Sequence, residues 1–419
     1  MNPQTIPMNT DAFERARAAF VAGIAAFESG RLEQAEAEFL ASLVLLPGRP
    51  STLVNLAATR LKLGRPAEAT TSLREALAAQ PKDGPAWVQL GIALLELRQH
   101  DEALQAFDRA LALDGRQPVV HHRRGLALMG LERPAEAAQA WEQAVAQDGQ
   151  FVTAWIDLGS LMRDLGQLSR ARQCLRQALA LGADDPLVHF QLAGLREPAP
   201  GEAPDSGRSP PDAPPPAYVE QLFDSYAEDF DAHLVQRLGY CAPAILVEGL
   251  AQRTVRRFTH ALDLGCGTGL CAEPLAPLCE RLDGVDLSAG MLEKARALGR
   301  YTALTQADVV AHLQGTPHRH DLIVAADVFI YVGALEAVFA GVQRCLTPGG
   351  WFCFSVETTD DTAGFVLRSS LRYAHSSDYL RRLAQRHGLE VQALEPHPLR
   401  RDEREGVQGL YGWLKRPLP

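Results

Sequence analysis

Three closely spaced glycines end a short apolar segment in the second half of the chain, in the stretch DLGCGTG at residues 263–269. Glycine lets the backbone turn sharply and lets a ligand approach it closely. A helix expected to begin near Gly269 would present free N–H groups at the same place. A single glycine-rich turn is a weak signal, so its meaning depends on the residues that follow the next strands.

Two acidic residues follow the next two expected strands. Asp286 ends the second strand, 21 residues after Gly265, where its carboxylate can accept both hydroxyls of a ribose. Asp308 follows the third strand, where it can receive the amino group of an adenine. The glycine spacing is GxGxG and not the GxGxxG of dinucleotide-binding folds. Together these residues indicate a site for a ligand that contains adenosine.

The elements that must position these residues alternate between apolar strands and helices from Phe258 onward. Helices are expected to begin near Gly269, Ser288, Gly333 and Ser377. Strands are expected at residues 260–264, 282–286, 303–306, 321–325, 351–356, 391–394 and 408–414. This alternation predicts a doubly wound, mainly parallel sheet, which binds ligands at the carboxyl ends of its strands.

Five stretches, ALDLGCGTGL, GVDLSAGMLEKA, TQADVV, DLIVAADVFIYVG and LTPGGWFCFSVE, give residues 218–419 a resemblance to class I S-adenosylmethionine-dependent methyltransferases. The resemblance implies a Rossmann-like α/β domain with S-adenosylmethionine as cofactor. The cofactor-binding residues that it implies are Asp263, Gly265, Gly267, Gly269, Asp286, Leu287, Met291, Asp308, Val309, Ala325, Asp327 and Tyr226.

The resemblance also assigns roles to these residues. The glycines would lie near the methionine moiety, and Asp263 would hold its amino or carboxylate end, directly or through water. Asp286 would bind the ribose, Leu287 and Met291 would wall the adenine, and Asp308 would bind its amino group. Val309, Ala325 and Asp327 would border the cofactor. Phe223, Tyr226 and Phe230 share one face of an expected helix, which would lie across the cofactor as a lid or simply pack against the core.

Methyl transfer from a sulfonium asks an enzyme mainly to align the acceptor with the methyl group. A general base is needed only where the acceptor must lose a proton, and a carboxylate acceptor needs none. Tyr331 and His375 are the candidates for the acceptor pocket, with His375 either a base or a structural residue. The sequence after the fourth strand is Ala-Asp-Val-Phe and not [DN]PP[YF], which argues against amino-methylation of adenine or glutamine. No metal site is expected, because His318 and His320 lack an evident third ligand.

The first half of the chain repeats with a period of 34 residues. Ala35, Ala69, Ala103, Ala137 and Ala171 keep this spacing, and a second series runs through Gly23, Ala57, Gly91, Gly125, Gly159 and Ala193. Small residues at such positions allow two helices to cross closely beside large neighbours. The pattern resembles the tetratricopeptide repeat, with five repeats over about 16–185 and a capping helix at 187–195. We therefore expect an all-α solenoid over residues 1–196.

Such a solenoid offers a concave groove to a partner. The residues expected on its inner face are mostly apolar, and they are Phe20, Ile24, Val54, Ala58, Val88, Ile92, His122, Leu126, Ile156 and Ser160. An apolar segment of a partner protein or peptide, the chain's own second domain or a dimer mate could occupy this groove. Alternatively, these side chains pack only between neighbouring helices.

A linker rich in proline separates the two halves, since eight of the 27 prolines lie between Pro198 and Pro216. We expect residues 197–216 to be a disordered spacer and residues 217–419 to be the methyltransferase domain. The net charge is −10 and neither half is basic, so binding to nucleic acid or to an anionic membrane is not expected. The odd number of cysteines, seven, and the lack of a secretory leader pattern favour the cytoplasm.

The whole chain resembles bacterial methyltransferases that contain tetratricopeptide repeats. The catalytic half alone is also similar to the small-molecule methyltransferases of quinone and biotin-precursor synthesis. We therefore expect methyl transfer to a small-molecule or carrier-bound acceptor, with the repeats mediating protein–protein interaction. Two alternatives stay open, a protein methyltransferase that recruits its substrate through the repeats and a catalytically silent scaffold that binds S-adenosylmethionine.

Overall fold

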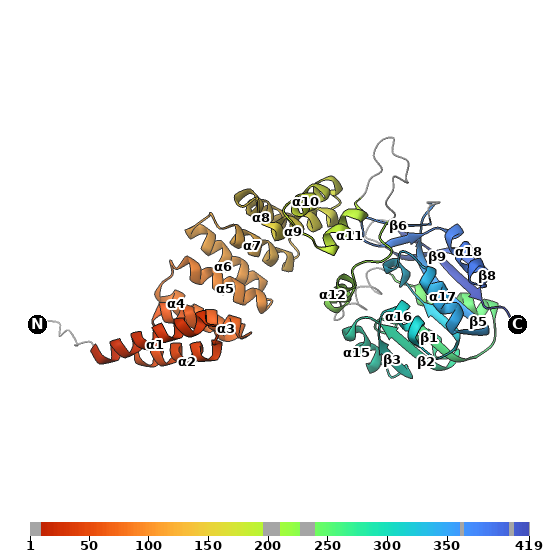
Figure 1. Cartoon of the computed structure of the whole chain (residues 1–419), viewed down its shortest axis with the longest axis horizontal. Coiled ribbons are helices and arrows are strands. Elements are labelled where there is room, and N and C mark those ends of the chain that lie inside the picture. Colours follow the sequence, from red (N-terminus) through yellow and green to blue (C-terminus); the bar gives the residue numbers. More distant parts are fainter. Residues whose placement is uncertain (1–9, 196–209, 227–238, 361–363, 402–405, 419) are drawn as a thin grey trace, which may run out of the picture. The chain divides into compact units, whose positions relative to one another are not determined.

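The computed structural model describes residues 10–195, 210–226, 239–360, 364–401 and 406–418. The chain forms two compact units, Met1–Ala183 and Asp184–Pro419 (Figure 1). The division falls before the predicted end of the solenoid at residue 196. Each unit is therefore described separately.

The described part of the first unit consists of helices that pair in chain order (Figure 1). They are α1 (Thr10–Glu28), α2 (Leu32–Leu45), α3 (Pro50–Lys62), α4 (Pro66–Ala79), α5 (Gly84–Glu96), α6 (His100–Leu113), α7 (Pro118–Gly130), α8 (Pro134–Gln147), α9 (Val152–Asp164) and α10 (Leu168–Ala180). The predicted all-α solenoid of five helix pairs is confirmed.

Close crossings of small on large residues explain the 34-residue period. A Cβ atom on Gly91 would lie 2.4 Å from the ring of Phe107, and one on Gly125 would lie 2.2 Å from Trp141. The aromatic ring of one helix therefore fills the space that a missing side chain leaves on its partner. Gly64 stands at the turn between α3 and α4 with φ of +70°, a conformation that favours glycine.

Nine of the ten residues predicted on the inner face of the solenoid are partly exposed, as a groove requires. His122 is the exception. It is buried, it shares a hydrogen bond of 2.7 Å with Asp157, and it lies between Trp141 and Phe151. His122 therefore packs between helices, as the alternative interpretation of these positions holds.

The second unit is built on a sheet with the strand order β3-β2-β1-β4-β5-β7-β6, to which β9 adds against β5 and β8 against β9. The strands are β1 (Phe258–Leu264), β2 (Cys279–Asp286), β3 (Ala303–Gln306), β4 (His320–Ala325), β5 (Leu346–Thr358), β6 (Phe365–Leu367), β7 (Tyr373–His375), β8 (Glu390–Arg401) and β9 (Gly406–Lys415). Pairings from β3 through β5 to β7 are parallel, and those of β5 with β9, β6 with β7 and β8 with β9 are antiparallel. The predicted, mainly parallel α/β sheet is confirmed.

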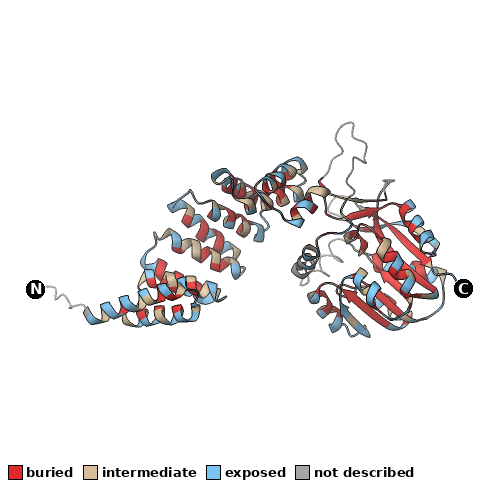
Figure 2. Ribbon diagram, viewed as in Figure 1, coloured by how far each residue is buried: buried red, intermediate tan, exposed pale blue. Residues whose placement is uncertain are grey.

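Helices cover both faces of this sheet, because successive residues of its central strands point to opposite sides. In β4, Ile323 packs with one cluster and Val324 with the other. The first cluster includes α16 (Val309–Gly315), α17 (Glu336–Cys345) and α18 (Ser377–Arg386), and the second includes α13 (Ala242–Arg253) and α14 (Ala272–Leu275). Figure 2 shows the central strands as the buried layer between these helices. Helix α15 (Ala289–Ala297) follows β2.

Helix α11 (Pro186–Gly194), which the sequence analysis expects to cap the repeats, is grouped by its contacts with the second unit. Its Phe190 is 2% exposed and packs with Leu371 and Tyr373 of the β6–β7 hairpin and with Tyr218. The apolar side chains of α11 are thus buried on the hairpin, and this packing groups the helix with the α/β unit.

The end of the proline-rich linker is also part of the second unit. Residues 210–215, here called the strap, are described, whereas residues 197–209 of the predicted disordered linker lie outside the described residues. The Tyr373 hydroxyl donates to the Pro211 carbonyl at 2.7 Å, and the N–H groups of Gly333 and Ala334 donate to the Asp212 carbonyl at 2.9 and 3.0 Å. Proline lacks an N–H donor, so the strap is held through its carbonyls. Helix α12 (Pro216–Tyr226) follows it directly.

Candidate functional site

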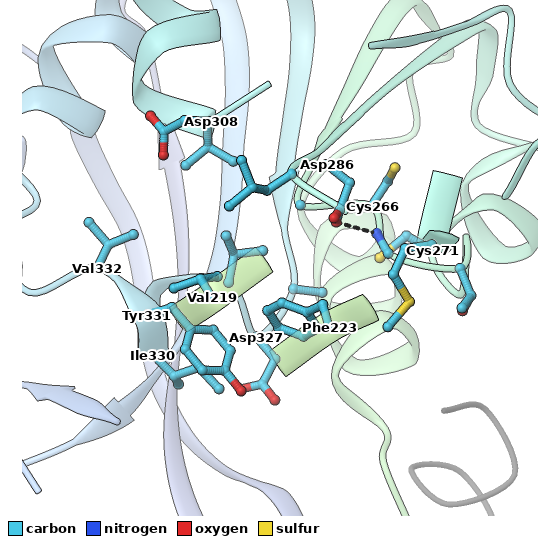
Figure 3. A pocket seen from close by; sticks show the side chains of 18 of the residues that line it. Val219, Phe223, Cys266, Cys271, Asp286, Asp308, Asp327, Ile330, Tyr331 and Val332 are labelled. Carbon is cyan, nitrogen blue, oxygen red and sulfur yellow. Dashed lines mark hydrogen bonds between the residues drawn. The ribbon is translucent and has the colours of Figure 1, made fainter. Parts of the chain in front are cut away.

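A cavity of about 550 Å³ opens at the carboxyl ends of the central strands. The strand order reverses between β1 and β4, which is where doubly wound sheets bind ligands. The strap, α12 and the loops after β1, β2, β3 and β4 all contribute to its walls (Figure 3). Its volume lies within the range of small-molecule and cofactor sites.

The loop after β1 requires glycine for two different reasons, packing and access of a ligand to the backbone. Gly265, Gly267 and Gly269 have φ of +66°, +54° and +97°, in or beyond the left-handed region that favours glycine. A Cβ on Gly265 would lie 2.5 Å from a methyl group of Val328, so this glycine is needed for packing. A Cβ on Gly267 would meet nothing within 4 Å, and Gly267 lines the cavity. The loop therefore offers a cradle of bare backbone.

Asp286 at the end of β2 joins this loop to α15. Its Oδ2 accepts the N–H of Gly267 at 2.8 Å, drawn as a dashed line in Figure 3, and its Oδ1 accepts the N–H of Ser288 at 2.9 Å. The side chain is 9% exposed and lines the cavity. These two hydrogen bonds hold the carboxylate in one orientation beside the glycine loop.

The wall beyond Asp286 is mostly apolar and contains Leu287, Met291 and Val309. Asp308 lines the same end and caps α16, because its Oδ1 accepts the N–H groups of Val310 and Ala311, each at 2.9 Å. Asp308 is exposed, so its other oxygen lies within reach of solvent or ligand. Figure 3 shows Asp286 and Asp308 on neighbouring loops.

Asp263 lies behind the glycine loop and does not line the cavity. It is 1% exposed, and its Oδ2 accepts the hydroxyl of Tyr301 at 2.7 Å. The Tyr301 ring is packed beneath the loop, where Cβ atoms on Gly269 and Gly284 would lie 3.1 and 2.9 Å from it. Asp263 and Tyr301 thus support the loop from below. Sequence reasoning missed Tyr301, since a tyrosine before a short strand carries no motif.

Burial raises the pKa of Asp263 from its usual 3.8 to about 7, although the hydrogen bond from Tyr301 opposes the shift. The nearby Asp286 carboxylate raises it further, whereas a hydrogen bond from the Cys271 thiol lowers it. The Asp263 carboxyl therefore holds a proton in the folded chain at pH values where it would be ionised in the unfolded chain.

We expect this group to make the second unit less stable as the pH rises from about 4 to about 7. In that window the folded state holds the Asp263 proton and the unfolded chain loses it, so the free energy of unfolding falls with pH. Calorimetric melting of wild type and Asp263→Asn at pH 5 and pH 7.5 checks this. The wild type should lose more stability between the two pH values than the variant, and equal losses would contradict the assignment.

Asp327 and Tyr331 lie after β4, on the opposite side of the cavity from Asp308. Asp327 has φ of +59°, which is unusual for aspartate, and its N–H donates to the hydroxyl of Ser355 at 2.9 Å. Tyr331 ends a 3₁₀ turn (Phe329–Tyr331), and its ring meets Phe223 of α12 edge-on at 5.1 Å between centroids. Figure 3 shows Asp327 beside the Tyr331 ring at this end of the cavity.

His375, the second predicted acceptor residue, is not brought to the cavity. It is fully buried in β7, its Nε2 is hydrogen-bonded to the carbonyl of Gly333 at 2.9 Å, and its ring stacks on Tyr379. Burial lowers its pKa to about 4. The ring is buried because it packs against Phe365 and Tyr379. The geometry favours the structural role.

Of the other predicted residues, Ala325 and Gly269 do not line the cavity, and the side chain of Tyr226 lies outside the described residues. Cavity residues that sequence reasoning missed include Tyr240, Cys266, Cys271 and Arg372.

No group of three or more potential metal ligands is present among the described residues. Within the same residues, no helix is both long and apolar enough to cross a membrane.

The residues of this site fit an adenosine-containing cofactor. The open backbone at Gly267 can approach a ligand, and the Asp286 carboxylate beside it is oriented for a diol. An apolar wall with one acid at its end is suitable for a purine ring. The fit rests on features that the loops after β1, β2 and β3 bring together.

Comparisons with known proteins match the repeats and the methyltransferase domain separately. A family model described as a methyltransferase domain matches residues 262–354, and two tetratricopeptide repeat models match residues 54–118 and 128–193. The ubiquinone biosynthesis O-methyltransferase of Vibrio cholerae is 35% identical over 100 residues, which are 23% of this chain and 41% of that protein. The trans-aconitate 2-methyltransferase of Paracidovorax citrulli is 34% identical over 105 residues, 25% of this chain and 40% of that protein. The chain thus spans about two fifths of the length of these relatives.

Two similar solved structures each cover about two fifths of the chain. A crystal structure of MamA covers 38% of this chain and 93% of that one, with 23% identity and a TM-score of 0.37. The N-methyltransferase NodS from Bradyrhizobium japonicum WM9, in complex with S-adenosyl-L-homocysteine, covers 42% of this chain and 85% of that one, with 21% identity and a TM-score of 0.35.

Proposed function

We propose that this chain transfers a methyl group to a small-molecule or carrier-bound acceptor. The chain joins tetratricopeptide repeats to a class I S-adenosylmethionine-dependent methyltransferase domain. The observation that carries the proposal is the pairing of the bare Gly267 backbone with the oriented Asp286 carboxylate in one cavity. The repeats would bind a partner protein or peptide through the half-buried apolar residues of their inner face.

The cavity wall suggests how the cofactor is held. The Asp286 carboxylate would accept the ribose hydroxyls, and Leu287 and Met291 would pack on the adenine. Asp308 keeps one oxygen outside its helix-capping hydrogen bonds and would accept the adenine amino group. The methionine part would follow the backbone of Gly265 and Gly267, with Asp263 acting through the loop that it supports.

When bound, S-adenosylmethionine supplies an electrophilic methyl group, so the chain's own residues have mainly to bind and align. The strap and Phe223 of α12 cover the cavity and would limit the access of water. The Tyr331 hydroxyl lines the cavity and would hydrogen-bond an acceptor bound there. His375 has no role in this scheme, because its ring is turned to the core.

The acceptor does not follow from the relatives. Their names report ubiquinone biosynthesis and trans-aconitate methylation, two different acceptors on one kind of cofactor domain. The family match spans only residues 262–354 and so excludes α12, the strap and the β6–β7 hairpin, which form other parts of the cavity wall. Protein methylation through the repeats and a silent scaffold are the competing functions.

All seven cysteines are free thiols, which supports a location in the reducing cytoplasm.

Calorimetric titration of the full chain with S-adenosylmethionine and with S-adenosylhomocysteine tests the proposal. We expect both ligands to bind at one site per chain, and binding of neither would overturn it. Incubation of the chain with cell extract and a methyl-labelled donor then separates the three functions. Label in small molecules or on a carrier-bound group supports the proposal, label on protein side chains supports protein methylation, and binding without any labelled product supports the scaffold.

A further inference from the structure

The two ends of the cavity differ in their charged side chains. Asp286 and Asp308 lie at the end formed by the loops after β2 and β3, where the adenosine is proposed to bind. The other end is formed by the segment after β4 and by the β6–β7 hairpin, and it contains Asp327, Tyr331, Val332 and Arg372. Among the described residues that line the cavity, Arg372 is the one basic side chain. This far end is the place left for the acceptor.

Arg372 is held by a tight and well-packed turn. The N–H of Arg368 donates to the carbonyl of Arg372 at 2.9 Å, and the N–H of Leu371 donates back to the carbonyl of Arg368 at 2.9 Å. Leu371 adopts φ of +60°, a strained value for leucine, and it is 1% exposed against Phe190 and Tyr373. Strain of this kind persists only where the surroundings enforce it, so the turn presents Arg372 in a defined position.

The guanidinium of Arg372 is half-buried and stays charged. Burial by itself would lower its pKa, but Tyr331, Glu357 and Asp327 outweigh burial and raise that pKa above its usual value. Glu357 already forms an ion pair with Arg368 at 3.0 Å, and Arg368 also donates to a backbone carbonyl. The charge of Glu357 is therefore largely balanced without Arg372.

Apolar side chains line the cavity together with Arg372. They include Val219 and Phe223 of α12 and Ile330 and Val332 after β4, which Figure 3 labels. A charged group in such surroundings is stabilised by an anionic partner that can accept from it. Arginine presents five N–H donors in a planar fork, which is more than the hydrogen bond to Tyr331 uses, and this fork matches a carboxylate.

We propose that Arg372 binds a carboxylate of the methyl acceptor, and that the acceptor is an apolar acid whose body packs on Val219, Phe223 and Ile330. This inference rests on the proposed function, because it assumes that the cofactor occupies the other end. The same carboxylate chemistry could come from the methionine part of the cofactor. The experiment must therefore measure cofactor and acid separately.

The test uses full-length chain saturated with S-adenosylhomocysteine, so that no turnover occurs. The probes are benzoate, cinnamate and octanoate, each compared by calorimetry with its own neutral amide. We expect at least one acid to bind at least tenfold more tightly than its amide. Arg372→Gln should reduce that acid's affinity at least tenfold, and Arg372→Lys should reduce it less, because lysine keeps the charge but loses the fork.

Arg381→Gln is the matched control, since this arginine is exposed on α18 and does not line the cavity. It should change neither affinity, and all variants should bind S-adenosylhomocysteine within twofold of wild type. Equal binding of acids and amides, or of acids to wild type and Arg372→Gln, would overturn the inference. So would a tenfold loss of S-adenosylhomocysteine in Arg372→Gln, which would assign Arg372 to the cofactor. If the wild type itself binds no S-adenosylhomocysteine, the proposed function has failed.

Discussion

Gly265→Ala should reduce the affinity for S-adenosylmethionine about a hundredfold or more and should destabilise the second unit by about 2–4 kcal/mol. The new methyl group would lie 2.5 Å and 2.9 Å from the two methyl carbons of Val328, and it would stand on a residue with φ of +66°. Val328 itself lines the cavity and is in the loop that carries Asp327 and Tyr331, so moving it would also disturb that part of the wall. Calorimetric melting and ligand titration of the full chain measure the two effects.

Two further variants separate packing from backbone strain. Adding Val328→Ala to Gly265→Ala removes the contact but keeps the left-handed φ, so stability should recover only in part. The new methyl group of Gly267→Ala would meet no atom within 4 Å. This variant should therefore lower the stability only by the backbone strain of about 1–2 kcal/mol, while its methyl group would still obstruct the cofactor. Wild-type affinity in Gly267→Ala would show that the ligand does not approach this backbone.

Asp286→Ala should weaken the binding of S-adenosylmethionine at least tenfold, which corresponds to about 1.4 kcal/mol. The substitution removes the proposed ribose contact and also the acceptor for the N–H groups of Gly267 and Ser288. Both losses lower the affinity. The complex lacks the ribose contact, and the ligand must order a glycine loop that the carboxylate no longer holds. Isothermal titration with S-adenosylmethionine and S-adenosylhomocysteine should show the same loss for both, because they share the ribose.

Glu293→Ala is the control for Asp286→Ala, because it removes an exposed carboxylate from α15 without touching the cavity. It should leave both affinities unchanged. The affinity of Asp286→Asn should lie between those of the wild type and Asp286→Ala, because its single carboxamide oxygen can satisfy only one of the two N–H groups. Unchanged affinity in Asp286→Ala would show that the ribose is held elsewhere.

Regular patterns in the sequence predicted most of the fold, because they act over short distances. The 34-residue period reports the contact of Gly91 with Phe107 and its equivalents, which recurs in each helix pair. The predicted strands β1, β2 and β4 each place apolar residues in both core clusters, since helices cover both sides of the sheet. The cofactor end of the cavity is similarly local, because each of its loops directly follows one predicted strand.

Three features could not be read from the chain, and each depends on contacts between distant segments. His375 is buried because its ring packs against Phe365 and Tyr379, contacts that a three-residue strand does not reveal. The strap is held by Tyr373 and Gly333, more than 100 residues away, although its composition predicts disorder. Helix α11 continues the repeat pattern but packs on Leu371.

By itself, the sequence determined the two kinds of fold and the cofactor class, because glycine spacing, strand-end acids and helix periodicity are local properties. The tertiary structure alone placed Tyr301 beneath the glycine loop and Arg372 in the cavity wall. Neither residue belongs to a periodic pattern, and each is brought to the site by a turn whose position depends on packing elsewhere. Tertiary folding therefore forms the end of the cavity proposed for the acceptor. The end proposed for the cofactor could already be predicted from local patterns in the sequence.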